Sequence, residues 1–123
     1  YDVADLWPLD PDGEILLMGI IESVEGLNNL RDILREVKGI GAIWAGPGDL
    51  SVTMGKRGNS DDPEVQEALL RILKICKEFD VPCMVGANPS NVEQRIEQGF
   101  RMIYAKPSLV NDTLQLGKKL VGR

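Results

Sequence analysis

A chain of 123 residues, 43% of them hydrophobic and 27% charged, has the length and composition of one modest globular domain or part of one. Its net charge of −5 and its pI near 4.7 argue against a nucleic-acid partner, because proteins that bind the phosphate backbone usually present a basic face. No apolar run reaches the roughly 20 residues that cross a membrane and no signal segment opens the chain, so we expect no membrane partner and a cytoplasmic location.

The first segment, residues 1–14, indicates a connector that leads into a strand. It contains Pro8, Pro11 and a Pro-Asp-Gly turn signal, so we expect little independent structure there. The chain opens on Tyr1 and not on methionine, and no folded element stands in front of the connector. We therefore expect that a further segment precedes these residues.

Residues 15–123 alternate four times between an apolar run and an amphipathic helix. The runs are continuous, as expected for parallel strands covered on both faces, and the helices show apolar residues at three- and four-residue spacing. Ser23 can cap the first helix, Asp62 can begin the second and Gly99 can end the third. The predicted strands are 15–21, 43–45, 82–85 and 101–105, and the predicted helices that follow them are 23–37, 62–76, 90–99 and 110–121.

Strict alternation of strands and helices predicts an α/β fold with a parallel sheet and right-handed crossovers. Two architectures remain open at this point. A doubly wound sheet would place its ligand where the strand order reverses, whereas a (β/α)8 barrel would collect the residues at its strand ends in one ring. Since a complete barrel takes about 250 residues, four units correspond to half of one.

Two carboxylates stand where predicted strands end. Glu22 directly follows the strand 15–21, and Asp49 follows Gly46-Pro47-Gly48 after the strand 43–45. Glycine permits close backbone approaches and Pro47 fixes one dihedral angle, so we expect a tight, well-defined loop. Two acids at two strand ends suggest a hard divalent cation held by oxygen. The alternatives are that Asp49 caps a short helix starting at Leu50 and that Glu22 pairs with a lysine.

Other reactive side chains are scarce. The sequence has no histidine, so any imidazole base must come from outside these residues. Cys76 and Cys83 are expected to be small buried hydrophobic residues in a reducing compartment. Lys106 ends the fourth predicted strand, where a Schiff-base lysine of a metal-free aldolase could sit, although a solvated lysine before Pro107 is the simpler interpretation.

The stretch around these acids resembles the HpcH/HpaI family of class II, metal-dependent pyruvate aldolases. In that family a strand ending in Ile-Glu is followed by a helix of the form Glu-Gly-x-x-Asn-Leu and then by a Gly-Pro-x-Asp-Leu-Ser loop. Here residues 21–30 and 46–51 match these motifs, with Met54-Gly55 closing the second. Residues 62–65 resemble the opening of the family's next helix, and residues 5–14 resemble a connector of a subgroup that includes macrophomate synthase-like sequences.

The resemblance implies that residues 15–123 are the C-terminal half of a (β/α)8 TIM barrel of the phosphoenolpyruvate/pyruvate-domain type. It also implies that Glu22 and Asp49 bind a divalent metal such as Mg²⁺ or Mn²⁺. The metal would polarise the 2-keto group and stabilise a pyruvate enolate, so that 4-hydroxy-2-oxo acids are cleaved to pyruvate and an aldehyde, or oxaloacetate is decarboxylated. The backbone N–H groups of Gly48 and Asp49 would bind the substrate carboxylate, and Ser51 would cap the short helix that follows.

The family's substrate-binding arginine and its histidine-centred acid/base residues lie in the half of the barrel that this chain lacks. We therefore assign no catalytic residue within residues 1–123 and expect the segment alone to be inactive. Family members often exchange or pack their last helix between subunits, which implies a homo-oligomer that involves residues 110–121. The acceptor aldehyde and the particular metal stay open.

Two other functions are compatible with the sequence. The chain could be a non-catalytic half-barrel that serves as an interaction module, or a citrate-lyase-like relative on the same barrel. The first differs from an aldolase in having no need of Glu22 and Asp49. The second would need a coenzyme A or phosphate site, and no feature of this sequence indicates one.

Overall fold

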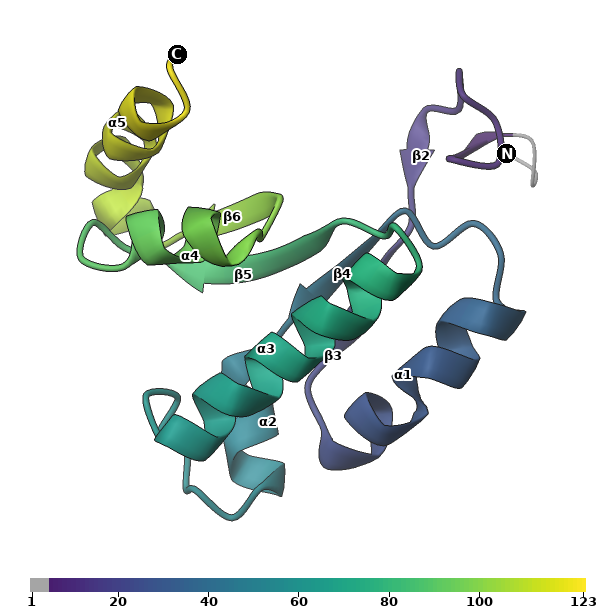
Figure 1. Cartoon of the computed structure of the whole chain (residues 1–123), viewed down its shortest axis with the longest axis horizontal. Helices are drawn as coiled ribbons and strands as arrows, with labels where there is room; N and C mark the ends of the chain where they lie inside the picture. Colours follow the sequence, from purple (N-terminus) through teal and green to yellow (C-terminus); the bar gives the residue numbers. More distant parts are fainter. Residues whose placement is uncertain (1–4) are drawn as a thin grey trace. The chain divides into compact units, whose positions relative to one another are not determined.

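A computed structural model describes residues 5–123, which form two compact units divided between Cys83 and Met84 (Figure 1). Residues 1–4, including Tyr1 of the predicted connector, lie outside the described residues. Each unit contains a pair of parallel strands with one helix between them in the sequence, β3 and β4 in the first and β5 and β6 in the second. Among residues 5–123, no helix is long and apolar enough to cross a membrane.

The first unit is built on the parallel strands β3 (Met18–Ile21) and β4 (Ala42–Ala45). Their register pairs Met18 with Ala42 and Ile21 with Ala45, so both strands end at the same level. Helix α1 (Val24–Glu36) connects them and begins as predicted, because the Ser23 side chain accepts a hydrogen bond from the Gly26 N–H.

Helix α3 (Pro63–Glu78) contributes more buried apolar residues to the first unit's core than any other element. Asp62 caps it by accepting a hydrogen bond from the Glu64 N–H, as the sequence predicts. Helices α1 and α3 lie side by side in Figure 1, and Arg31 of α1 makes two hydrogen bonds of 2.8 Å to Glu78 of α3. The buried apolar residues of α3 are Val65, Ala68, Leu69, Ile72, Leu73, Ile75 and Cys76.

The connector is more ordered than the sequence predicts. Strand β1 (Leu6–Trp7) pairs in parallel with β2 (Ile15–Leu16), and the predicted turn is present because the Gly13 N–H bonds to the Asp10 carbonyl. The single strand predicted over 15–21 is therefore wrong, since β2 and β3 are separate strands. The physical reason is a change of partner at Leu17: β2 pairs with the connector, whereas β3 pairs with β4.

The second unit contains strands β5 (Cys83–Ala87) and β6 (Met102–Ala105), which are parallel. Helix α4 (Val92–Gln98) lies between them in sequence and ends as predicted at Gly99, which has a left-handed φ of 100°. After β6, a short 3-10 turn, η2 (Pro107–Leu109), leads into helix α5 (Val110–Leu120). With β3, β4 and their helices, these elements confirm four consecutive strand–helix units of a parallel α/β protein.

Candidate active site

The two strand ends that carry the predicted site meet closely. The Gly46 N–H, just beyond β4, donates a 3.0 Å hydrogen bond to the carbonyl oxygen of Ile21, the last residue of β3. A Cβ at Gly46 would lie 3.2 Å from Ile20 Cγ2 and 3.4 Å from Glu22 Cβ. Contacts this short leave little room for a side chain, so glycine at this position lets the chain after β4 pass directly beside Glu22.

The segment after Gly46 is a helix rather than the tight loop that the sequence predicts. Helix α2 (Pro47–Thr53) begins at once, with Gly46 in the N-cap position and Pro47 in its first turn. Asp49 belongs to that first turn and does not cap the helix, which corrects the alternative in which it would. Ser51 is not a cap either: it is fully buried inside α2, and its hydroxyl donates to the Gly48 carbonyl.

Glu22 and Asp49 line one hollow of about 210 Å³. Both side chains are exposed to solvent, one from the end of β3 and the other from the first turn of α2. The remaining lining residues are Ile20, Trp44, Gly46, Pro47 and Gly48. The structure thus brings the two predicted carboxylates to a single site, together with Gly46 and Gly48 of the motif.

The hollow has an apolar wall formed by Ile20 and Trp44. Ile20 and Trp44 are direct partners in the register of β3 and β4, so their side chains stand next to each other on the same face of the pair. Ile20 and Glu22 are two residues apart, and side chains with that spacing share a strand face. The two-residue period therefore predicts Ile20 on the same face as Glu22. The placement of Trp44 depends on the register of the two strands, which the sequence does not reveal.

The donor set of the hollow fits a hard divalent cation. Two carboxylates that line the same solvent-accessible space supply oxygen ligands, and coordination by water or substrate would complete the shell. Within residues 5–123, no group of three or more acidic, cysteine or histidine side chains could hold a metal ion. A Cβ at Gly48 would have no heavy atom within 4 Å, which leaves space beside the carboxylates for a further ligand.

The start of α2 also offers backbone donors. The first N–H groups of a helix have no carbonyl partner within the helix, and Gly48 and Asp49 are the first residues of α2 that carry an N–H, because Pro47 has none. Their amide groups belong to the same turn that brings Asp49 to the hollow. The arrangement can therefore hold a cation on its carboxylates and an anionic group on its amides.

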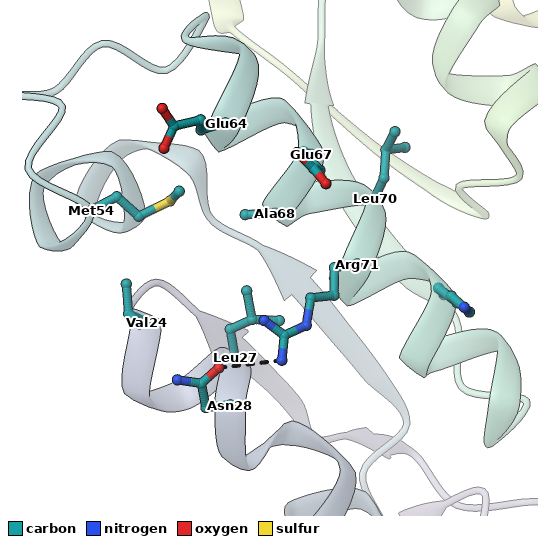
Figure 2. A pocket seen from close by; sticks show the side chains of 10 residues that line it. Val24, Leu27, Asn28, Met54, Glu64, Glu67, Ala68, Leu70 and Arg71 are labelled. Carbon is teal, nitrogen blue, oxygen red and sulfur yellow. Dashed lines mark hydrogen bonds between the residues drawn. The ribbon is translucent and has the colours of Figure 1, made fainter.

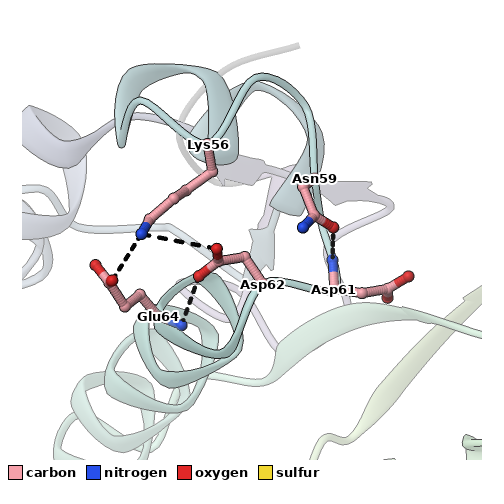
Figure 3. Close-up of polar contacts among 5 residues, drawn as sticks. All are labelled: Lys56, Asn59, Asp61, Asp62 and Glu64. Atoms are coloured by element: carbon pink, nitrogen blue, oxygen red, sulfur yellow. Dashed lines mark hydrogen bonds and ion pairs between the residues drawn. The ribbon is translucent and has the colours of Figure 1, made fainter.

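A cluster of ion pairs holds the segment between α2 and α3 (Figure 3). Lys56 Nζ lies 2.6 Å from Glu64 Oε1 and 3.7 Å from Asp62 Oδ2. The hydrogen bond to Glu64 is the main cause that raises the pKa of Lys56. Because Asp62 also caps α3, the cluster ties the segment that leaves α2 to the first turn of α3.

The two cysteines behave as the sequence predicts. Cys76 and Cys83 are both buried, and the hydrogen bond between their thiols, together with burial, raises the pKa of Cys83. The Cys83 thiol therefore stays protonated at neutral pH, and burial of both side chains fits small core residues and not reactive thiolates. Lys106, the alternative Schiff-base residue, is exposed at the start of η2 in the second unit.

Parallel strands alternating with helices, with acidic side chains gathered where two of the strands end, define the class of α/β proteins that bind ligands at the carboxyl ends of their strands. Comparison with known proteins identifies the family. Residues 11–105 match the HpcH/HpaI aldolase/citrate lyase family, and the chain belongs to it.

Named relatives agree with this assignment. The chain is 38% identical over 103 residues to the 4-hydroxy-2-oxo-heptane-1,7-dioate aldolase of Escherichia coli, a match that covers 78% of this chain and 39% of that protein. It is 45% identical over 58 residues to the hydroxypyruvate/pyruvate aldolase of Pseudomonas aeruginosa, covering 47% of this chain and 21% of that protein. The chain therefore spans well under half the length of these relatives.

The fold is also that of a solved family member. The crystal structure of the HpcH/HpaI aldolase from Desulfitobacterium hafniense matches with a TM-score of 0.71 and 24% sequence identity, over 95% of this chain and 46% of that one. This likeness confirms the predicted fold class, a partial barrel of parallel strand–helix units. The resemblance of the connector to macrophomate synthase-like sequences stays a prediction.

Proposed function

We propose that the protein containing this chain is a metal-dependent aldolase that cleaves or forms 4-hydroxy-2-oxo acids, giving pyruvate and an aldehyde. In this proposal residues 1–14 are a connector, and residues 15–123 are the C-terminal half of the barrel. The observation that carries the proposal is the single hollow of about 210 Å³ lined by both Glu22 and Asp49. Family membership and the names of the aldolase relatives support the class of reaction.

Each residue of the hollow has a role that follows from its chemistry. Glu22 and Asp49 would hold the divalent cation, for which Mg²⁺ and Mn²⁺ are the candidates, as oxygen ligands. When bound, the cation would supply Lewis-acid polarisation of the 2-keto group. The amide groups of Gly48 and Asp49 would donate hydrogen bonds to the substrate carboxylate, since a helix N-terminus favours an anion.

The apolar wall would orient the substrate in the hollow. Ile20 and Trp44 cannot hydrogen-bond a charged group through their apolar atoms, so the methyl or methylene end of a 2-oxo acid would face them. The substrates proposed are small 2-oxo acids such as pyruvate or oxaloacetate together with an aldehyde. We further propose a cytoplasmic, homo-oligomeric enzyme, whose acid/base residues lie outside residues 1–123.

Carboxamide substitution tests the metal site in the complete protein. Glu22→Gln and Asp49→Asn keep the shape of each side chain but remove its charge, so each should weaken Mn²⁺ binding by at least about tenfold and abolish most of the metal-dependent oxaloacetate decarboxylation. Titration with Mn²⁺, followed by electron paramagnetic resonance, measures binding separately from activity.

The matched control is Glu25→Gln. Glu25 is exposed in the first turn of α1, three residues from Glu22, and does not line the hollow. It should leave both binding and activity unchanged. If Glu22→Gln and Asp49→Asn bind Mn²⁺ as the unaltered protein does, the two carboxylates have no part in a metal site, and the non-catalytic interaction module becomes the better interpretation.

A further inference from the structure

The short helix α2 is held at both of its ends to the chain that runs from β3 into α1. Its N-cap residue, Gly46, donates a 3.0 Å hydrogen bond to the carbonyl oxygen of Ile21. Its last residue, Thr53, accepts a 3.2 Å hydrogen bond at Oγ1 from the N–H of Val24, the first residue of α1. Glu22 therefore lies between the two points at which α2 is attached.

The segment that carries Glu22 and helix α2 have matching lengths. Residues 46–53 span about 10 Å, because a helix rises about 1.5 Å per residue. Residues 21–24 span about the same distance when extended, at roughly 3.3 to 3.6 Å per residue. Ser23 is indeed extended, with φ of −140° and ψ of 156°. The segment with Glu22 thus runs alongside α2 between the two hydrogen bonds.

Thr53 also sets how α2 is rotated about its axis. Thr53 and Asp49 are four residues apart in α2, and helical residues with this spacing lie on the same face. The hydrogen bond at Thr53 therefore turns the face that carries Asp49 toward the segment that carries Glu22. The same hydroxyl donates a 2.9 Å hydrogen bond to the Leu50 carbonyl, which fixes the orientation of its oxygen.

The hydrogen bond at Thr53 lies beside a hollow and not beside a filled core. Figure 2 shows this hollow, about 530 Å³ in volume, with Val24 and Met54 on one side of it and α3 on the other. Val24 is 39% exposed, and Met54 directly follows α2. Packing therefore constrains the end of α2 less than a filled core would, so the hydrogen bond has a role that packing does not duplicate.

We propose that Thr53 is a positioning residue of the metal site, whose hydroxyl keeps Asp49 close enough to Glu22 for both carboxylates to bind one divalent cation. This inference rests on the proposed function, and it adds a residue that does not line the hollow of the two carboxylates. Like charges repel when no cation lies between them, so fixing both segments in advance favours metal binding. Residues that orient a ligand alter metal affinity without touching the metal.

Removal of one hydroxyl in the complete protein tests this role. Thr53→Val keeps the size and branching of the side chain, and the site is exposed to solvent, so the protein should stay folded. The dissociation constant of Mn²⁺, measured by electron paramagnetic resonance, should rise about tenfold. Amide hydrogen exchange in residues 47–53, followed by mass spectrometry, should become faster because the end of α2 is released. Thr53→Ser keeps the hydroxyl and should restore both properties.

The matched control is the same substitution at the chain's other threonine. Thr113 lies in α5 of the second unit, and its hydroxyl is buried with no hydrogen-bond partner among the described residues. Thr113→Val should leave Mn²⁺ binding and the exchange of residues 47–53 unchanged. Far-ultraviolet circular dichroism would verify that each variant is folded.

The outcomes separate a positioning role from a merely structural one. Weaker Mn²⁺ binding in Thr53→Val that is restored in Thr53→Ser supports the proposal. If the affinity changes by less than about threefold, the proposal is wrong, whether or not the exchange of α2 becomes faster. Failure of the proposed function has a different signature: Glu22→Gln and Asp49→Asn would bind Mn²⁺ as the unaltered protein does, and both proposals would then fall.

Discussion

Single glycines decide how closely the segments of the first unit approach. At Gly46 the missing side chain allows the strand ends to meet beside Glu22, and at Gly13 it allows the connector to turn back on itself. A Cβ at Gly13 would lie 2.6 Å from the Asp5 carbonyl oxygen and 2.8 Å from the Trp7 nitrogen. Both are backbone atoms and cannot move aside as the end of a side chain can. At Gly48, in contrast, the space is open.

Alanine at Gly13 and alanine at Gly48 should therefore differ in their effect on the stability of the complete protein. Gly13→Ala should lower the free energy of unfolding by about 1–3 kcal/mol, because the added methyl group would push the backbone of residues 5–7 away from Gly13. Gly48→Ala should leave it unchanged or raise it by up to about 1 kcal/mol, because alanine favours the helical conformation and meets no neighbour. Urea unfolding measures both variants, and an equal loss in both would contradict the steric explanation.

Helices α1 and α3 are joined at their surface as well as through their core. Arg31 makes two hydrogen bonds to Glu78, and this interaction with Arg31 is the main cause that lowers the pKa of Glu78 below its ordinary value of 4.5. A carboxylate whose pKa is lower in the folded state binds fewer protons there than in the unfolded chain. Its contribution to stability is then complete above pH 4.5 and is lost as pH falls through the folded pKa.

The pH dependence of the complete protein should show this link. Glu78→Gln should melt at a lower temperature than the unaltered protein at pH 7. The difference should shrink as pH falls below 4.5 and vanish once Glu78 is protonated in the folded state as well. The effect should be small because both side chains are exposed to solvent. Glu36→Gln, at the exposed C-terminal end of α1, is the control. A difference that stays constant from pH 7 to pH 3 would show that the ion pair is not its cause.

At the scale of the whole chain, apolar strand residues face outward in each unit. Ile20 of β3 is 47% exposed in the first unit, and Tyr104 of β6 is 44% exposed in the second. Interior strand positions of a complete domain are normally covered, so the exposure of these side chains is what the proposed half-barrel would show. The half-barrel proposal also agrees with the matches to the aldolase relatives, which cover less than half the length of those proteins.

Residues 1–123 expressed alone should therefore dimerise, aggregate or stay partly unfolded. Uncovered strand faces and unpaired strand edges associate readily, because association buries apolar area and satisfies backbone groups. Sedimentation and thermal melting of the isolated segment measure this. A sharp cooperative melt of a monomer would show that the segment is a complete domain, and the half-barrel proposal would then fail.

The sequence alone predicted the succession of elements and the two acids. The signals for strands and helices are local in sequence. They are apolar runs, apolar residues spaced by three and four, and capping residues such as Ser23, Asp62 and Gly99. Each depends on neighbours within a few residues, so the sequence alone reveals it. For the same reason Glu22 and Asp49 stood out as acids at strand ends. The family resemblance, carried by residues 21–30 and 46–51, was confirmed by the match over residues 11–105.

Only the tertiary structure decided how these parts meet. The division of the run 15–21 into β2 and β3 and the docking of the connector depend on strand partners far away in sequence. The register of β3 against β4 sets Trp44 beside Ile20, and the hydrogen bond from Gly46 to Ile21 brings Glu22 and Asp49 to one hollow. Strand pairing is a contact between distant residues, and its register is fixed by packing and not by any local pattern. For this reason the two acids and Ile20 were predictable from the sequence, and the position of Trp44 was not.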